Sequence, residues 1–274
     1  MGKIYRVTPS SPTFNAMLYG DPGSGKTTLA ATAQDCPEMA DVLFANIEGG
    51  LLPIAHRCDI HAEKIRTTED INKLFWRFAK KENELSTYRT VVIDSMTELQ
   101  TINLEEIVKA AMEGGKARSR SGKERTENDI WQEDYGQSTT ALKRIVRGFK
   151  DLRVNVIVTA LAKYVYPKVA EKADKTDVDP IAVMPSLTAK LGESVMGYMD
   201  FVWYTFYDQE EDKYKLLTKS QGAYRAKTRG PRFQEAVGPV IISPNMATIY
   251  DTFVKATSGE SVAPTRPAKK KRSA

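Results

Sequence analysis

A glycine-rich segment near the amino terminus constrains the fold of this chain more than any other feature of its sequence. Residues 20–27 read Gly-Asp-Pro-Gly-Ser-Gly-Lys-Thr, which matches the pattern G-x-x-x-x-G-K-[ST] in full. The apolar run Phe14–Gly20 before it is typical of a buried strand, and Lys26–Gln34 after it has helix-forming spacing. A strand, a tight loop and a helix in this order present successive backbone N–H groups to an anion. The segment therefore predicts a loop that binds phosphate groups.

The residue types in this loop fit the phosphates of a nucleotide bound with magnesium. Glycine lets the backbone wrap around the anion, and the following helix presents the positive end of its dipole. We expect Lys26 to reach the β- and γ-phosphates and Thr27 to offer its hydroxyl to Mg²⁺. The predicted cofactors are therefore ATP and Mg²⁺. The predicted nucleotide site consists of Gly20, Asp21, Pro22, Gly23, Ser24, Gly25, Lys26, Thr27 and Thr28.

Apolar runs alternate with amphipathic segments up to residue 161, which predicts an α/β fold with a mainly parallel central sheet flanked by helices. Antiparallel strands are expected near the carboxyl end, and residues 114–128 and 162–180 have the composition of long polar loops. The predicted strands are Phe14–Gly20, Asp41–Glu48, Tyr88–Asp94, Arg153–Leu161, Asp200–Tyr207 and Lys213–Lys219. The predicted helices are Lys26–Gln34, Thr68–Lys81, Thr97–Met112, Glu133–Leu152, Leu187–Met196 and Asn245–Thr257.

The length of 274 residues predicts one large α/β domain with two short extensions. We expect an extended lead-in over residues 1–13, the domain over residues 14–257 and a disordered basic tail over residues 258–274. The net charge of +5 equals the charge of the last twelve residues, which hold five cations and no acid. The rest of the chain is neutral, so whole-protein charge does not by itself predict a nucleic-acid partner.

Nothing in the sequence predicts a membrane partner or an export route. No apolar run approaches the roughly 20 residues of a membrane span, and the first residues lack the apolar core of a secretory signal. Cys36 and Cys58 have neither zinc-binding nor redox spacing. We therefore expect a cytoplasmic protein with reduced thiols.

Two acidic residues end apolar strands beside the predicted loop. Asp94 stands where a carboxylate can hold the water shell of Mg²⁺ or, as the alternative, cap the helix that follows. Glu48 stands where it can polarise an attacking water or, as the alternative, serve as a charged loop residue. The predicted catalytic residues are Lys26, Asp94 and Glu48, and the predicted Mg²⁺ ligands are Thr27 and Asp94.

With these sites in place, the chain resembles the RecA-like recombinase core. Thr90–Leu99 is similar to the magnesium-binding strand of that family, and Leu43–Ile54 is similar to the strand that carries its catalytic glutamate. Tyr135–Leu161 resembles the helix and strand that lead to the second DNA-binding loop. The resemblance implies a RecA-like P-loop NTPase core and makes Glu48 the general base for ATP hydrolysis.

The later segments resemble the compact phage-encoded branch of this superfamily, which includes AAA ATPases and single-strand annealing proteins. Pro185–Asp200 and Tyr224–Gly230 carry this resemblance, and it implies the cytoplasm of the host cell if the chain is phage-encoded. One departure concerns the polar sensor of recombinases at the end of the fourth core strand, where Leu161 stands and Thr159 is the nearest polar side chain. The chain also lacks room for the extra domains of full recombinases, so strand exchange by this protein alone is not expected.

Two segments have the composition of a nucleic-acid surface. Residues 116–125 hold five cations against one acid, and their place matches the first DNA-facing loop of the RecA-like family. Residues 163–168 mix cations with aromatic rings that can stack on bases. The alternative for residues 116–125 is a solvated surface loop, and the alternative for residues 163–168 is a lid over the nucleotide. The predicted nucleic-acid contacts are Lys116, Arg118, Arg120, Lys123, Arg125, Tyr164 and Tyr166.

The resemblance also implies an assembly of several subunits. In RecA-like assemblies, cations near the place of Lys227 and Arg229 cross to the γ-phosphate of a neighbouring subunit. The alternative for both residues is a basic surface turn. The implied partners are single-stranded DNA, further copies of this chain in a ring or filament, and a single-strand-binding protein.

These predictions combine into a RecA-like ATPase that binds single-stranded DNA and assists annealing or recombination. A P-loop kinase for a small molecule is one alternative, with residues 114–128 as its mobile lid. A nucleotide-switched binding module of a replication complex is another. Glu48 favours the ATPase over the kinase, because its place suits the activation of water rather than of an acceptor hydroxyl.

Overall fold

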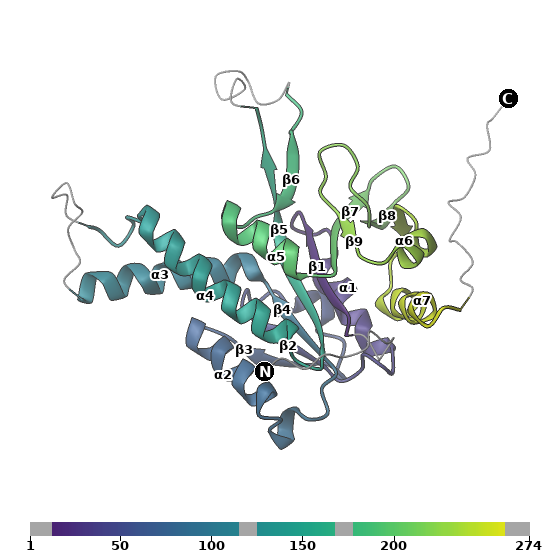
Figure 1. Ribbon diagram of the computed structural model, residues 1–274, viewed down its shortest axis with the longest axis horizontal. Helices are drawn as coiled ribbons and strands as arrows, with labels where there is room; N and C mark the ends of the chain where they lie inside the picture. Colours follow the sequence, from purple (N-terminus) through teal and green to yellow (C-terminus); the bar gives the residue numbers. More distant parts are fainter. Residues whose placement is uncertain (1–12, 115–124, 168–177, 261–274) are drawn as a thin grey trace, which may run out of the picture.

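One mixed β-sheet runs through the molecule, and helices cover both of its faces (Figure 1). The computed structural model describes residues 13–114, 125–167 and 178–260. Within these residues, eight strands follow one another across the sheet in the order β10-β8-β7-β1-β5-β4-β2-β3, with β6 paired to β5 and β9 paired to β7. This is the predicted α/β architecture, with a mostly parallel sheet and antiparallel strands towards the carboxyl end.

The parallel part of the sheet contains the four strands predicted before residue 162 and the first strand predicted after it. Its strands are β1 (Asn15–Gly20), β2 (Val42–Asn46), β3 (His61–Lys64), β4 (Thr90–Asp94), β5 (Asn155–Val165) and β7 (Phe201–Asp208). β3 was not predicted, because its four residues His-Ala-Glu-Lys are polar and mostly exposed and form no apolar run.

The antiparallel part consists of β8, which was predicted, and of short strands that were not. Its strands are β6 (Ala182–Pro185), β8 (Lys213–Leu217), β9 (Lys227–Thr228) and β10 (Val240–Ile242). The predicted polar loop 162–180 is wrong in its first residues, because β5 continues to Val165 and pairs antiparallel with β6. The side chains in this extension are half-buried or exposed, which hides the strand from an apolar pattern.

Two hydrophobic cores lie on opposite faces of the sheet, as the alternation along β1 shows. Met17 and Tyr19 pack into the core under the larger helices, whereas Leu18 packs into the core on the other face. The first face carries α2 (Thr68–Ala79), α3 (Met96–Glu113), α4 (Gln132–Lys150), α5 (Ala189–Tyr198) and the turn η3 (Asn83–Leu85). The second carries α1 (Lys26–Ala31), α6 (Pro231–Val237), α7 (Met246–Ser258) and the turns η1 (Thr32–Asp35) and η2 (Leu52–Ile54).

The register of the sheet brings the predicted site residues to one edge. β1 lies between β5 and β7, so Gly20 stands level with Leu161 on one side and Thr205 on the other. Asp94 ends β4 level with Asn46 at the end of β2. The carboxyl ends of parallel strands form the edge where ligands bind in open α/β sheets.

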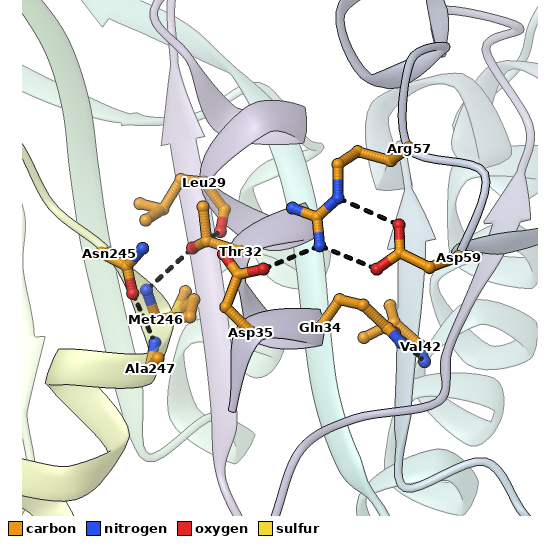
Figure 2. A network of polar contacts seen from close by, with 10 residues as sticks. All are labelled: Leu29, Thr32, Gln34, Asp35, Val42, Arg57, Asp59, Asn245, Met246 and Ala247. Carbon is orange, nitrogen blue, oxygen red and sulfur yellow. Dashed lines mark hydrogen bonds and ion pairs between the residues drawn. The ribbon is translucent and has the colours of Figure 1, made fainter. Parts of the chain in front are cut away.

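Polar contacts fix the far end of the helical segment that follows the glycine-rich loop (Figure 2). The Thr32 hydroxyl accepts a hydrogen bond of 2.8 Å from the backbone N–H of Met246 at the start of α7. Arg57 donates to Asp35 at 2.7 Å and also pairs with Asp59. These contacts tie α1 and η1 to α7 and to the turn after η2, and they hold the loop in front of α1 in place.

The predicted lead-in and most of the predicted tail lie outside the described residues. The same holds for 115–124 and 168–177. In the part of the chain that the structure describes, no helix is both long enough and apolar enough to cross a membrane.

Candidate functional site

The glycine-rich loop turns tightly between β1 and α1. Gly23 and Gly25 adopt φ angles of 77° and 84°, in the left-handed region that favours glycine. At Gly20 a Cβ atom would lie 2.3 Å from the backbone oxygen of Thr205, so no other residue fits without movement of β7. The Ser24 hydroxyl lies 2.8 Å from the Thr205 hydroxyl. The wrapped backbone has the shape that phosphate binding requires.

Lys26 places its ammonium inside this loop. Its Nζ donates to the backbone oxygens of Gly20 at 3.0 Å and Asp21 at 2.8 Å. Burial lowers the pKa of Lys26, while the charges of Glu48, Asp94 and Asp21 oppose that shift. A half-buried cation held by two backbone oxygens of the loop is placed to meet the phosphates of a nucleotide.

Asp94 is buried at the end of β4 and accepts two hydroxyl hydrogen bonds. Thr27 donates to its Oδ2 at 2.9 Å, and Thr159 of β5 donates to its Oδ1. Burial raises the pKa of Asp94, and the charge of Glu48 adds to the rise, whereas both threonine hydroxyls and Lys26 act against it. A carboxylate joined to the Thr27 hydroxyl is an all-oxygen set of the kind that holds Mg²⁺.

Glu48 is exposed just after β2, next to Asp94. The backbone N–H groups of Ile47 and Glu48 donate to the backbone oxygen of Asp94, at 2.9 and 3.2 Å. The carboxylate is close enough to shift the pKa values of both Lys26 and Asp94. The structure therefore brings Lys26, Thr27, Asp94 and Glu48 together at one edge of the sheet.

A cavity of about 1160 Å³ opens beside the first half of the loop, and six aromatic side chains are among its lining residues. We call it the aromatic cavity. Its walls come from β5, β7, β8 and residues 221–224, and Asp21–Ser24 of the loop close one side. Tyr164 donates to the Asp21 carboxylate at 2.6 Å, and the Tyr204 hydroxyl lies 3.5 Å from the same oxygen.

Sequence reasoning missed the roles of Tyr204 and Thr205. The two residues belong to β7, whose sequence is largely aromatic and apolar. Only the pairing of β7 with β1 shows that this strand borders the loop. Thr159 was noted as a polar neighbour of Leu161, but its contact with Asp94 follows from the register of β4 with β5.

Comparison with known families adds an independent observation. The family described as AAA domain matches residues 14–230, which include the loop, Glu48 and Asp94. The chain belongs to the AAA domain family. The match places it among P-loop ATPase-type proteins, a class that uses a nucleotide and Mg²⁺. A search of curated proteins finds no match.

The AAA domain buries Arg125, which was predicted to contact nucleic acid. The side chain is 2% exposed and forms an ion pair with Asp134 of α4. Its guanidinium also lies 4.5 Å from the centre of the Trp131 ring. Arg125 therefore holds the start of α4 in place and is not free to bind a phosphate group.

The other predicted nucleic-acid contacts divide between two places. Tyr164 points to Asp21 at the loop, and Tyr166 follows β5 just beyond its end. The remaining cations, Lys116, Arg118, Arg120 and Lys123, lie outside the described residues of the AAA domain.

Lys227 and Arg229 lie at the other end of the sheet from the loop. β9 pairs with Phe201 and Val202, at the amino end of β7, whereas the loop follows the carboxyl end of β1. Lys227 donates to the backbone oxygen of Met196, and Arg229 pairs with Asp200 at 2.7 Å. Lys227 and Arg229 therefore have partners in their own chain, and both lie away from the phosphate loop.

Leu161, which the resemblance to recombinases puts at the place of their polar sensor, carries no polar side chain. Its backbone N–H donates to the Thr97 hydroxyl at 3.0 Å, which ties the middle of β5 to the start of α3. Thr159, the nearest polar side chain on β5, is in contact with Asp94.

Proposed function

We propose that this AAA domain binds and hydrolyses ATP with Mg²⁺, and that it binds single-stranded DNA to assist annealing or recombination. The observation that carries the hydrolysis proposal is the position of Glu48. Its backbone is bonded to Asp94, and its carboxylate acts electrostatically on both Lys26 and Asp94. An exposed carboxylate beside a phosphate-binding cation suits the activation of water.

Each residue then has a separate task in hydrolysis. The loop backbone and Lys26 hold the phosphates and offset their charge. Thr27 and Asp94 supply oxygen ligands for Mg²⁺, while Thr159 fixes the second carboxylate oxygen of Asp94. Glu48 orients a water molecule and takes its proton. Bound Mg-ATP supplies a polarised terminal phosphoryl group.

Three observations support the DNA-binding part of the proposal. Residues 116–123 hold a dense group of cations that can neutralise phosphates. The paired strands β5 and β6 project beside the phosphate loop and carry Tyr164 (Figure 1). The sequences Pro185–Asp200 and Tyr224–Gly230 resemble the phage-encoded branch that includes single-strand annealing proteins. We also propose that further copies of this chain and a single-strand-binding protein are partners.

The Glu48→Gln variant tests the hydrolysis proposal. We expect it to keep its affinity for Mg-ATP and to lose turnover by about 100-fold or more, since a positioned base contributes that much. Phosphate release measures turnover, and a fluorescent ATP analogue measures affinity. Glu98→Gln is the matched control on α3. Loss of turnover in Glu98→Gln with normal turnover in Glu48→Gln would assign the base to Glu98 instead.

Removal of the loop cations tests the DNA proposal. Lys116, Arg118, Arg120 and Lys123 are changed to Gln in a chain that ends at residue 260, so that the basic tail cannot supply affinity. Arg125 stays, because it is buried in an ion pair. Each lost contact lowers the log–log salt slope of single-strand binding by about 0.7. An unchanged slope would exclude this loop as the DNA surface.

The aromatic cavity keeps a kinase as a second candidate function, because such an enzyme needs an acceptor site next to the loop. ATP turnover with and without single-stranded DNA separates the candidates. Stimulation by DNA supports the recombination proposal, and phosphate transfer to a nucleoside supports a kinase. Tight ATP binding with negligible turnover supports a nucleotide switch.

A further inference from the structure

We infer that the aromatic cavity binds one unstacked nucleobase of a single strand and that Asp21 links this base to the phosphate loop. The inference rests on the proposed DNA binding and adds that the cavity holds a base of the strand. Its observations are the aromatic walls, the absence of cations among the lining residues that the structure describes, and the contact between Tyr164 and Asp21.

The aromatic walls offer ring faces of the kind on which bases stack. Tyr204 forms the base of the cavity, with ring centroids 4.7 Å from Tyr224 and 5.8 Å from Phe206. Tyr204 and Phe206 are nearly parallel, at 16°. Tyr224 and Phe206 are half-buried, so part of each ring remains open to the cavity. The volume of about 1160 Å³ is ample for a base with its sugar, since pockets for small ligands begin near about 300 Å³.

The charges of the lining select a neutral planar group over an anion. Among the described residues, the lining holds two carboxylates, Asp21 and Asp212, and two amides, Gln209 and Gln221, but no lysine or arginine. A phosphate inside the cavity would meet these carboxylates without a cation, so the sugar–phosphate backbone must stay at the mouth. Base amino and imino groups, in contrast, can donate to a carboxylate or an amide oxygen.

The cavity is separate from the expected place of the nucleotide's own phosphates. It touches Asp21–Ser24, whereas Lys26–Thr28 do not line it. Tyr204, Phe206 and Tyr164 pack with the core on the α2–α5 face, and α1 lies on the opposite face of the sheet. A base in the cavity would therefore approach the loop from the side that α1 does not occupy.

Asp21 connects the two sites because it belongs to the loop and also lines the cavity. Its Oδ2 accepts the Tyr164 hydroxyl, and within the described residues its Oδ1 has no hydrogen-bond donor. Burial strongly raises the pKa of Tyr164, so this hydroxyl stays protonated and donates to Asp21. A base that bonds to Asp21 or displaces Tyr164 alters the loop, and by linkage a bound nucleotide alters base affinity equally.

The test compares a thymidine oligonucleotide with an abasic strand of the same length, using the full chain and fluorescence anisotropy. The two strands carry the same phosphates and differ in their bases. We expect tighter binding of the thymidine strand. Tyr224→Ala should lower the affinity for the thymidine strand by about 5- to 140-fold and leave the affinity for the abasic strand unchanged. Tyr224→Trp should restore binding, which separates stacking from a folding defect. Trp76→Ala, which removes an exposed aromatic ring on α2, is the control.

Several outcomes would overturn the inference. Equal binding of both strands by the wild type, or equal weakening of both by Tyr224→Ala, would show that the cavity takes no base. A raised Kd for ATP in Tyr224→Ala with unchanged strand binding would assign the cavity to the base of ATP. Competition by free thymidine as strong as by the strand would assign the site to a nucleoside.

The test of base binding does not depend on the hydrolysis proposal. Lys26→Ala should lower turnover by about 100- to 1,000-fold and retain the difference between the thymidine and abasic strands. Absence of any strand binding by the wild type would overturn the proposed DNA function together with the inference. Equal affinity of the wild type for the thymidine and abasic strands would overturn the inference and leave the proposed DNA function standing.

Discussion

The phosphate loop and the aromatic cavity beside it are built in opposite ways. The loop is one run of consecutive residues, 20–27, and its shape follows from glycines with positive φ and a short turn. The cavity joins residues between 204 and 224 to Tyr164 of β5 and to Asp21–Ser24 of the loop, which lie far from that stretch in the sequence. The two meet at Asp21. The comparison teaches that the residue types of a segment can specify an anion site, whereas a pocket for a planar group depends on the register of several strands.

The largest expected effect is confined to the loop. Lys26→Ala removes the half-buried cation and should lower the turnover number for ATP by about 100- to 1,000-fold, as loss of one charge-stabilising donor does. Steady-state phosphate release measures it. The thermal midpoint should stay within a few degrees of the wild type. Turnover equal to the wild type would show that the loop does not hold the reacting phosphate.

Gly20→Ala tests the place where the loop depends on a distant strand. The added Cβ would meet the backbone oxygen of Thr205 at 2.3 Å, so β1 and β7 must move apart. Overpacking of this kind costs about 1–3 kcal/mol of unfolding free energy. Urea titration measures the loss. Gly50→Ala is the control, because a Cβ there meets no atom within 4 Å. Equal stability of the two variants would show that β7 does not restrict the loop.

Asp94→Asn tests whether the buried carboxylate costs stability when no metal is bound. The folded-state pKa of Asp94 is raised, so the unfolded state binds fewer protons in the window above the ordinary aspartate range. In EDTA the wild type should therefore become more stable as the pH falls through the folded pKa. The Asp94→Asn variant, which has no carboxylate to titrate at this position, should lack this dependence of stability on pH. Near neutral pH its thermal midpoint should be about 2–4 °C higher, equivalent to about 1 kcal/mol.

Calorimetry in EDTA at several pH values gives this comparison, and Mg-ATP affinity should fall in the same variant. A lower midpoint for Asp94→Asn would mean that the hydrogen bonds from Thr27 and Thr159 outweigh the cost of burying the charge.

The smallest expected effect lies at the contact between the two regions. Tyr164→Phe removes the hydrogen bond to Asp21 and should cost about 1 kcal/mol of unfolding free energy. A double-mutant cycle with Asp21→Asn isolates the coupling between the two side chains. Tyr166→Phe serves as the control. A coupling energy near zero would show that the loop and the cavity are energetically independent.

The sequence predicts the architecture well because the main strands are apolar runs. The structure confirms the strands and helices predicted from these runs, together with the mainly parallel sheet. β3, β6, β9, β10 and α6 escaped prediction because they are short, and several of them are half exposed. A short half-exposed strand is defined by the neighbour that it pairs with, and the neighbour is not visible in the local pattern.

The site residues also divide into those that a local pattern predicts and those that depend on contacts between strands. The loop residues, Asp94 and Glu48 could be proposed from their places at the ends of strands. Arg125 looked like one more cation of a polar loop, because its partner Asp134 lies nine positions later. Tyr204 was not singled out, because only the pairing of β7 with β1 brings its hydroxyl to Asp21. Such contacts depend on strand register, which residue types alone do not specify.

The central place of β1 has a consequence for synthesis on the ribosome. The chain makes β1 and the loop first, yet the backbone of Phe14 bonds to Asn155, 141 positions later, and β7 starts only at Phe201. At about 5–20 residues per second, β1 waits on the order of ten seconds or more for its neighbours. During that time an apolar strand edge is open to other chains, so folding yield should depend on translation speed and on chaperones that shield nascent strands.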